Sequence, residues 1–434
     1  MNKYGLEVPS ILLPQVADLS KWPVIACDQF TQDRDYWKRV KAAVGGSPST
    51  LNMIFPEVFL PDNDAAQRIT DIHSAMKRYL TEGVFAQPRQ GFIYIERDTP
   101  CQKKRRGLVA AIDLEQYDWH PDARPLIRST EGTVPERLPP RMDIRRGAPL
   151  ELPHILLLID DDTGSLLPNL GERVKNTTPV YSTPLMMDSG SVTGWFLDAE
   201  SDMNFISVKF DELLQRSAGR YEGEKPFLFA VGDGNHSLAA AKGVWDARKS
   251  AGGSCLGSAP CRYALVEIEN IYDPAIQFEP IHRLVFDAGF DRVIALLSHL
   301  PDFSSTTVGN TQDLSKAVSG SGFCARPAAG NRFGVVSEGR YALIETSASG
   351  IATACLQPLL DEYAKDDSKL IDYIHDEKEL FRLAAMERAA GILLPPVQKS
   401  GLFETVARFG PLPRKSFSMG HSCEKRFYLE CRKL

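Results

Sequence analysis

The stretch Pro226-Phe-Leu-Phe-Ala-Val231, followed by Gly232-Asp-Gly-Asn235, decides the fold of this chain. Its first part is almost entirely apolar, which is typical of a strand buried in a sheet. The Gly-Asp-Gly-Asn segment is typical of a turn. The Ala-rich run over residues 237–250 predicts a helix that ends before the next glycine pair. We therefore expect a strand, a tight turn and a helix.

Such a turn is a candidate anion site. The first turn of a helix presents backbone N–H groups and the positive end of the helix dipole, so it attracts anions. Gly232 and Gly234 allow the backbone to approach a ligand closely. Asp233 is suited to hold a metal or to accept a hydroxyl proton, and His236 is suited to donate to a phosphate.

The turn matches no complete phosphate-binding motif. No Gly-Lys-Ser/Thr follows, so it is not a Walker A loop, and Ser237 occupies the place of the third glycine in Gly-x-Gly-x-x-Gly. The alternative is a purely structural turn in which Asn235 or Ser237 caps the helix. The residues alone leave both readings open.

Strand-like and helix-like segments alternate along the rest of the chain, which predicts a mixed α/β (α+β) fold. Expected helices lie at residues 64–81, 205–218, 237–250, 291–300 and 377–390. Expected strands lie at 91–96, 108–114, 154–160, 226–231, 262–269, 280–286, 332–336 and 341–345. Glycine and serine become more frequent over 288–310, so we expect a core domain at 1–290 and a smaller C-terminal α/β region at 291–434.

Two stretches stand out from this alternation. Residues 124–153 show little periodicity and contain six prolines and six arginines, which predicts a long functional or disordered loop. The basic stretch Lys103-Lys-Arg-Arg106 lies between two expected strands, and we interpret it as a solvated hairpin turn.

The bulk composition excludes several classes of protein. A formal net charge of -6 over 434 residues argues against a nucleic-acid surface, which requires clustered basic residues. No apolar run approaches the length of a membrane span. The eight cysteines show neither C-x-x-C nor zinc-finger spacing. We expect a cytoplasmic protein with a small-molecule partner, and the sequence leaves its oligomeric state open.

Further candidates lie on both sides of the turn. Glu131 is suited to deprotonate a hydroxyl, and Arg137 and Arg141 are suited to clamp a phosphate. The alternatives are a solvated glutamate and surface ion pairs. Asp28 follows an apolar run and is a candidate Mg²⁺ ligand or a helix cap, whereas Cys27 has no neighbouring base that would make it a nucleophile.

The candidate site residues in the C-terminal part of the chain also have structural alternatives. His282 and Arg283 lie in a strand-like segment, where a core histidine satisfied by a hydrogen bond is the usual reading. His375 precedes a helix and suits a cap. Lys415 and Ser416 could reach a phosphate, although a solvated lysine is the ordinary expectation.

Short motifs across nearly the whole chain resemble those of the bacterial and archaeal family called domain of unknown function 1015. Asp233-Gly-Asn-His236 resembles its Asp-Gly-His-His-Arg motif. Other matching segments are Pro23–Asp28, Glu131–Thr133 with Arg137 and Arg141, Glu279–Arg283, Tyr373–His375 and Pro413–Ser416. The family is similar to the ParB/sulfiredoxin superfamily, which includes free-serine kinases. The resemblance therefore implies a ParB/sulfiredoxin-like core that binds a nucleotide, ADP or ATP, with Mg²⁺.

The resemblance is incomplete at the turn itself. Asn235 stands in place of the first family histidine, and Ser237 stands in place of the arginine. Loss of that arginine removes a bidentate phosphate ligand. Phosphate binding would then depend on backbone N–H groups, on His236 and on other basic residues.

Two functional hypotheses of different classes follow. The first is a nucleotide-dependent phosphotransferase, a serine-kinase-like enzyme acting on a small hydroxylated metabolite. Glu131, Asp233 and His236 would be catalytic, and the charge of the phosphates would be neutralised by Arg137, Arg141 and Lys415. The second is a non-catalytic nucleotide- or metabolite-binding regulator. A hydrolase or nuclease is a third, which the acidic balance disfavours.

Overall fold

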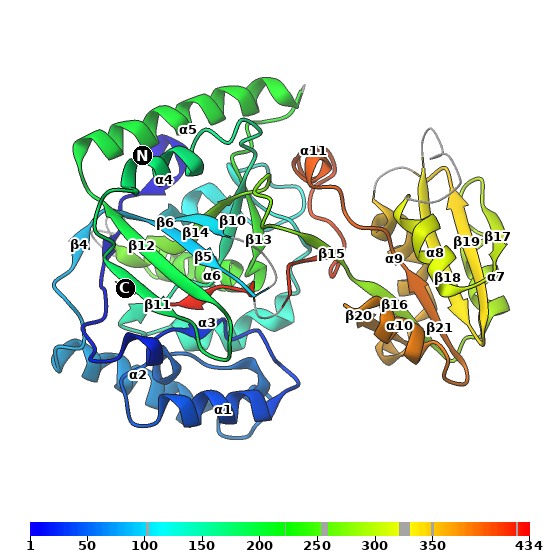
Figure 1. Cartoon of the computed structure of the whole chain (residues 1–434), viewed down its shortest axis with the longest axis horizontal. Coiled ribbons are helices and arrows are strands. Elements are labelled where there is room, and N and C mark those ends of the chain that lie inside the picture. Colours follow the sequence, from blue (N-terminus) through cyan, green and yellow to red (C-terminus); the bar gives the residue numbers. More distant parts are fainter. Residues whose placement is uncertain (101–103, 222, 253–258, 321–329, 349–350, 422–423) are drawn as a thin grey trace. The chain divides into compact units, whose positions relative to one another are not determined.

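The computed structural model describes residues 1–100, 104–221, 223–252, 259–320, 330–348, 351–421 and 424–434, which divide into two units (Figure 1). Unit 1 comprises Met1–Gln277, Val406–Pro411 and Gly420–Leu434, and unit 2 comprises Phe278–Thr405 and Leu412–Met419. The predicted mixed α/β class is confirmed. The division differs from the expected boundary at 290, because the strand at Phe278–Pro280 pairs with Phe417–Met419 inside unit 2.

Unit 1 is built on a large sheet that has ten strands in the described part, in the order β11-β12-β5-β6-β14-β10-β13-β8-β7, with β1 paired to β6. The β10–β14, β13–β8 and β8–β7 pairs are parallel and the rest antiparallel. The strands are β1 (Leu6–Glu7), β5 (Phe92–Asp98), β6 (Arg105–Asp113), β7 (Tyr117–Asp118), β8 (Ile127–Ser129), β10 (Leu156–Ile159), β11 (Tyr181–Pro184), β12 (Ser191–Leu197), β13 (Phe229–Asp233) and β14 (Tyr263–Asn270).

Three short pairs complete the strands of unit 1. They are β2 (Ser10–Ile11) with β4 (Arg89–Gln90), β3 (Val24–Ile25) with β23 (Phe427–Tyr428), and β9 (Leu150–Glu151) with β24 (Arg432–Lys433). The last two pairs join the C-terminal end of the chain to segments far earlier in the sequence. They place the residues around 425–432 within the core of unit 1.

Helices cover both faces of the large sheet. They are α1 (Arg34–Val44), α2 (Ala65–Thr81), α3 (Leu138–Arg145), α4 (Leu167–Val174), α5 (Glu200–Arg220) and α6 (Asn235–Ser250). Because side chains alternate along a strand, Phe92 and Tyr94 of β5 pack in one core with α4, α5 and α6, whereas Ile93 and Ile95 pack in the other with α1 and α2. A strand buried on both faces has no polar alternation, as the apolar runs of the sequence predict.

Unit 2 has its own sheet and its own core. Six strands pair in the order β17-β19-β18-β21-β16-β20 in the described part, and β15 pairs with β22. The strands are β15 (Phe278–Pro280), β16 (His282–Phe286), β17 (Ser304–Val308), β18 (Asn331–Ser337), β19 (Arg340–Thr346), β20 (Ile371–Ile374), β21 (Ala389–Leu393) and β22 (Phe417–Met419). The helices are α7 (Phe290–Leu297), α8 (Thr311–Ser319), α9 (Ala352–Tyr363), α10 (Glu377–Leu383) and α11 (Lys399–Phe409), the last of which runs into the Val406–Pro411 segment of unit 1.

Three predictions about local structure are wrong. The helix expected over 377–390 ends at Leu383, because the following residues form the interior strand β21. The expected loop 124–153 contains β8, α3 and β9. The third prediction is wrong only for the solvation of Arg105: β5 and β6 do pair as the expected hairpin, but Arg105 begins β6 and is buried, while Lys103 lies outside the described residues. In each case tertiary pairing overrides the local pattern.

Two further observations concern the described residues. No helix among them is both long and apolar enough to cross a membrane. Their cysteines, Cys27, Cys261, Cys355 and Cys431, carry free thiols. The remaining four, Cys101, Cys255, Cys324 and Cys423, lie outside the described residues.

Candidate functional site in unit 1

The predicted strand–turn–helix is present as β13, Gly234 and α6. Gly234 is the N-cap of α6 and has φ +81°, a left-handed conformation that favours glycine. A Cβ at this position would lie 3.0 Å from Cγ1 of Ile155. The cap makes no side-chain hydrogen bond, so neither Asn235 nor Ser237 has the capping role of the structural alternative. Both belong to the first turn of α6, where backbone N–H groups attract anions.

Asn235 links the end of β8 to this turn by hydrogen bonds. Its side chain is buried, and its Oδ1 lies 2.5 Å from the Ser129 hydroxyl and 3.3 Å from the Thr130 backbone nitrogen. The Ser129 hydroxyl also lies 2.8 Å from the carbonyl oxygen of Glu131. The Thr130 hydroxyl donates to the Val231 carbonyl at 2.5 Å. The structure therefore brings the Glu131 backbone to the start of α6, while the role of the Glu131 carboxylate as a base stays a prediction.

Asp233 faces a cation that the sequence did not suggest. Its Oδ2 lies 2.9 Å from Nζ of Lys425, and its Oδ1 accepts the Gly234 N–H at 2.9 Å. Burial by itself would raise the pKa of Asp233, but the Lys425 ammonium and its hydrogen bond outweigh burial and hold this pKa below the ordinary value. Asp233 is therefore a carboxylate at neutral pH and an acceptor for a proton or a hydrogen bond.

A chain of hydrogen bonds lies beside this ion pair. His154 precedes β10, and its Nε2 lies 2.8 Å from Oγ of Ser237 while its Nδ1 lies 2.9 Å from the hydroxyl of Tyr428. That hydroxyl accepts the backbone N–H of Cys27 at 3.2 Å. The four residues, which we call the His154 cluster, come from four distant parts of the sequence. They line a cavity of about 130 Å³ together with Arg141.

The two candidate arginines, Arg137 and Arg141, have different surroundings. Arg141 forms a short ion pair with Glu57, and both side chains are largely buried, whereas Arg137 is exposed. Burial raises the pKa of Glu57, only partly opposed by the Arg141 charge. Arg141 thus brings a cation to the wall of the cavity, while its Nη1 donates to the Arg137 carbonyl at 2.7 Å.

His236 and Asp28 make hydrogen bonds outside the His154 cluster. Nε2 of His236 accepts the Val134 N–H at 3.3 Å and so holds the segment that leads into α3. Asp28 accepts from the side chain of Gln29 at 3.0 Å. No group of three or more His, Cys, Asp or Glu that could hold a metal ion occurs among the described residues. A protein-built Mg²⁺ site at Asp28 is therefore not supported.

The burial of Cys27 raises the pKa of its thiol well above the ordinary value. This agrees with the expectation that Cys27 is not a nucleophile.

The other predicted residues belong to unit 2. His282 and Arg283 are buried in β16, and Arg283 donates to Gln357 at 3.0 Å and lies over the Tyr373 ring. His375 and Lys415 are exposed, whereas Ser416 is buried. Their participation at the α6 turn stays a prediction.

His282 is the satisfied core histidine of the alternative reading. Its Nδ1 accepts the backbone N–H of Leu394 at 3.1 Å, and burial, reinforced by the Arg283 charge, lowers its pKa to about 4. Since the folded-state pKa is depressed, the stabilisation is complete above the unfolded value of about 6.5 and is lost as pH falls toward 4. The full difference corresponds to about 3 kcal/mol.

We expect the Leu394 amide to lose protection against hydrogen exchange between pH 7 and pH 4, after correction for the intrinsic rate. In a His282→Asn variant, whose amide oxygen can accept the same bond without titrating, that dependence should largely disappear. Equal protection of the wild-type amide at both pH values would contradict the assignment.

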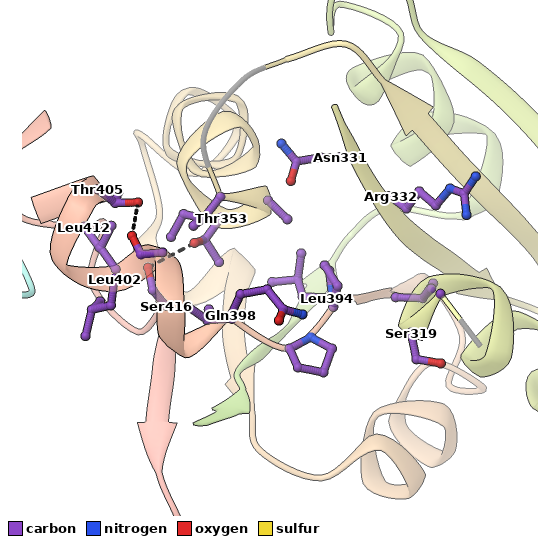
Figure 2. Close-up of a pocket in the computed structure, with 18 of the residues that line it drawn as sticks. Ser319, Asn331, Arg332, Thr353, Leu394, Gln398, Leu402, Thr405, Leu412 and Ser416 are labelled. Carbon is purple, nitrogen blue, oxygen red and sulfur yellow. Dashed lines mark hydrogen bonds between the residues drawn. The ribbon is translucent and has the colours of Figure 1, made fainter. Parts of the chain in front are cut away.

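Unit 2 also contains a cavity of about 430 Å³ (Figure 2). Its described wall includes the amides of Asn331 and Gln398 and the hydroxyls of Thr353 and Ser416, which are 3.0 Å apart. Arg332 reaches the wall while its Nε donates to Glu345 at 2.7 Å. Of all the residues singled out in the sequence, only Ser416 lines this cavity.

Comparison with known protein families gives a match over most of the chain. The model of the family described as "Protein of unknown function (DUF1015)" matches residues 12–363. None of the curated proteins matches this sequence. Similar solved structures include a conserved hypothetical protein from Pyrococcus furiosus, at 13% identity and TM-score 0.36, covering 75% of this chain and 94% of that one.

Two other similar solved structures are a kinase and a protein called SbnI. A free serine kinase in complex with AMP has 13% identity and TM-score 0.37, and covers 74% of this chain and 90% of its own. SbnI with a C-terminal truncation, from Staphylococcus aureus, has 9% identity and TM-score 0.37, and covers 72% and 82%.

Proposed function

Because the chain belongs to the DUF1015 family, a family of unknown function, its chemistry must be inferred from its own site, and we propose that it is a nucleotide-dependent phosphotransferase acting on a small hydroxylated metabolite. One observation carries the proposal. A carboxylate, Asp233, is kept ionised by Lys425 at the start of α6, beside a cavity whose wall includes Arg141.

The residues present fit a phosphorylated ligand. The first turn of α6, whose N-cap Gly234 has no side chain, and the cations Lys425 and Arg141 favour bound phosphate groups, which is the main requirement of phosphoryl transfer. A cavity of about 130 Å³ is smaller than the roughly 300–1,000 Å³ of ordinary ligand pockets, so it suits a phosphate or a small acceptor rather than a whole nucleotide. ADP or ATP with Mg²⁺ would supply the phosphoryl group and neutralise its charge.

The chain's own groups would then act as follows. The first turn of α6 orients the phosphates, and Lys425 and Arg141 lower the repulsion between them and the incoming hydroxyl. Asp233 accepts the proton of that hydroxyl, with Glu131 as the other candidate base. Asn235 keeps the Glu131 segment in place, and His236 fixes the segment before α3.

The test is nucleotide binding and consumption by the full chain. ADP, ATP, CTP and GTP, each with and without Mg²⁺, should be compared by thermal shift on wild type, His236→Ala and the control Asp246→Asn, a partly exposed position on α6. A nucleotide at about 100 times its Kd adds about 2.7 kcal/mol, a shift of several degrees. We expect that shift in wild type and in the control and its loss in His236→Ala.

Consumption then decides between enzyme and binding protein. ATP with serine and other hydroxylated amino acids should yield ADP and a phosphorylated acceptor. Absence of any nucleotide shift, or full turnover by both Glu131→Ala and His236→Ala, would overturn the proposal.

A regulatory binding protein is the second candidate, and the cavity of unit 2 favours it. That cavity is larger than the one in unit 1, and amides and hydroxyls dominate its polar wall, which suits recognition rather than proton transfer. Under this alternative a metabolite slows hydrogen exchange in α9 and β18 and is not consumed. Thr353→Val with Gln398→Ala should abolish that effect, whereas His236→Ala should leave it unchanged.

A further inference from the structure

The His154 cluster contains a hydroxyl, a base and a group that orients the base. Ser237 Oγ lies 2.8 Å from Nε2 of His154, and the other ring nitrogen lies 2.9 Å from the Tyr428 hydroxyl. The rings of His154 and Tyr428 meet edge to face, with centroids 5.3 Å apart. A nucleophile, a base and an orienting partner within hydrogen-bond reach of one another form the arrangement by which enzymes activate serine.

Tyr428 can hold His154 in the tautomer that a general base needs. Burial, reinforced by the neighbouring Cys27 thiol, keeps the pKa of Tyr428 well above its ordinary value, so the group remains a phenol. Its oxygen accepts the Cys27 N–H and can also accept a hydrogen from Nδ1 of His154. In that tautomer the lone pair of Nε2 faces Ser237, which is the orientation a general base needs.

The surroundings of Ser237 select the electrophile. Ser237 is the third residue of α6, so its hydroxyl stands beside the backbone N–H groups of the first turn. Ser237 and His154 are partly exposed and line the 130 Å³ cavity with Arg141. Asp233 and its partner Lys425 are close enough for His154 to influence the carboxylate electrostatically. These features suit an anionic phosphoryl group rather than a neutral carbonyl compound.

We propose that Ser237 is a nucleophile that carries the phosphoryl group as a covalent phosphoserine, with His154 as its base, so that transfer proceeds by double displacement. This inference rests on the proposed phosphotransferase function and specifies its chemistry. In the first step Oγ of Ser237 bonds to the terminal phosphorus of the nucleoside triphosphate. The bond from that phosphorus to the bridging oxygen breaks, the diphosphate leaves, and the hydroxyl proton passes to Nε2 of His154.

In the second step the acceptor hydroxyl attacks the same phosphorus. Its oxygen bonds to phosphorus, and its proton passes to Asp233. The bond from phosphorus to Ser237 Oγ breaks, and Nε2 of His154 returns its proton to that oxygen.

The experiment uses the full chain and two readouts. The first is peptide mass spectrometry after brief incubation with ATP and Mg²⁺ without an acceptor, to detect phosphate on Ser237. The second is labelling by a fluorophosphonate, a phosphorus electrophile that modifies activated serines without needing a nucleotide. Ser237→Ala, His154→Gln and Tyr428→Phe are compared with Ser250→Ala, an exposed serine at the end of the same helix.

We expect both readouts to map to Ser237 in wild type and in Ser250→Ala, and to vanish in Ser237→Ala. His154→Gln should lower the labelling rate about 10²-fold or more, the ordinary contribution of a general base. Tyr428→Phe should lower it less, with the unfolding midpoint of each variant checked by Trp fluorescence to exclude loss of fold. Fluorophosphonate labelling without nucleotide consumption would support the nucleophile and overturn the phosphotransferase.

Turnover with an unmodified Ser237, or undiminished turnover by Ser237→Ala, would overturn the inference and leave the proposed function standing. Equal fluorophosphonate labelling of wild type and a folded His154→Gln would overturn the role of His154 as base.

Discussion

Asp233→Asn is expected to slow phosphoryl transfer about 10²- to 10⁴-fold, because the amide cannot accept the acceptor's proton. Lys425→Met should also slow transfer, by a different route. Without the ammonium 2.9 Å away, burial of Asp233 is opposed only by His154 and by the Gly234 N–H, so we expect the pKa of Asp233 to rise above its ordinary value. The initial rate of ADP formation is the measurement.

The pH dependence separates the two variants. In wild type the lowered pKa of Asp233 contributes stability that is present above its unfolded pKa and is lost as pH falls. In Lys425→Met the pH dependence of the free energy of unfolding has the opposite sign. We therefore expect this variant to become more stable on acidification and to regain activity at higher pH. Asp233→Asn should regain neither stability at low pH nor activity at high pH.

The matched control is Lys242→Met, which removes a largely buried lysine of α6 that pairs with Asp246 at 3.1 Å. It should leave the rate unchanged. Equal rates in Lys425→Met and wild type would show that the ion pair has no part in catalysis.

Glu267→Gln is expected to destabilise unit 1 by about 3–5 kcal/mol, because it leaves buried arginines without their counter-ion. Glu267 is fully buried, its Oε2 lies 2.6 Å from Nη1 of Arg426, and its Oε1 lies 3.4 Å from Nη2 of Arg97. It belongs to a buried ionic network that joins three strands of the sheet to the C-terminal segment, comprising Arg97, Arg105, Glu267, Glu269, Arg426 and Glu430.

Two features make Glu267 the critical anion of this network. Burial, reinforced by the neighbouring Glu267 charge, raises the pKa of Glu269, whereas the charges of Arg97 and Arg426 hold the pKa of Glu267 below its ordinary value against burial. Gly107 on the neighbouring strand leaves room for the Glu267 carboxylate, since a Cβ there would lie 2.3 Å from Oε1. Removing the Glu267 charge therefore leaves Arg97 and Arg105 dependent on Glu269, while Arg426 keeps only Glu430.

The measurement is urea unfolding followed by Trp fluorescence. All five tryptophans, at 22, 37, 119, 195 and 245, lie in unit 1, so the signal reports that unit alone. Glu172→Gln is the control, because Glu172 forms an exposed ion pair with Lys175 on α4, and it should not move the midpoint measurably. An unchanged midpoint for Glu267→Gln would mean that the network does not stabilise the unit.

The same network explains one failure of the sequence reading. A run of four basic residues between two strands usually lies in solvent, and the local pattern gave no reason to expect otherwise. Arg105 is buried because its guanidinium donates to the carbonyls of Glu424 and Ala275, both remote in sequence. Its environment is created by the pairing of strands and by the returning C-terminal segment.

The mixed α/β class and the strand–turn–helix at 226–250 could be predicted from the sequence alone, whereas the left-handed backbone that favours glycine at 234 was seen only in the structure. The class and the strand–turn–helix depend on local periodicity, which adjacent residues fix. Only the tertiary structure decided which side chains meet at that turn. Lys425, His154 and Tyr428 reach it because the β10–β13 and β3–β23 pairings close long loops, and contacts of that range leave no periodic trace in a single sequence.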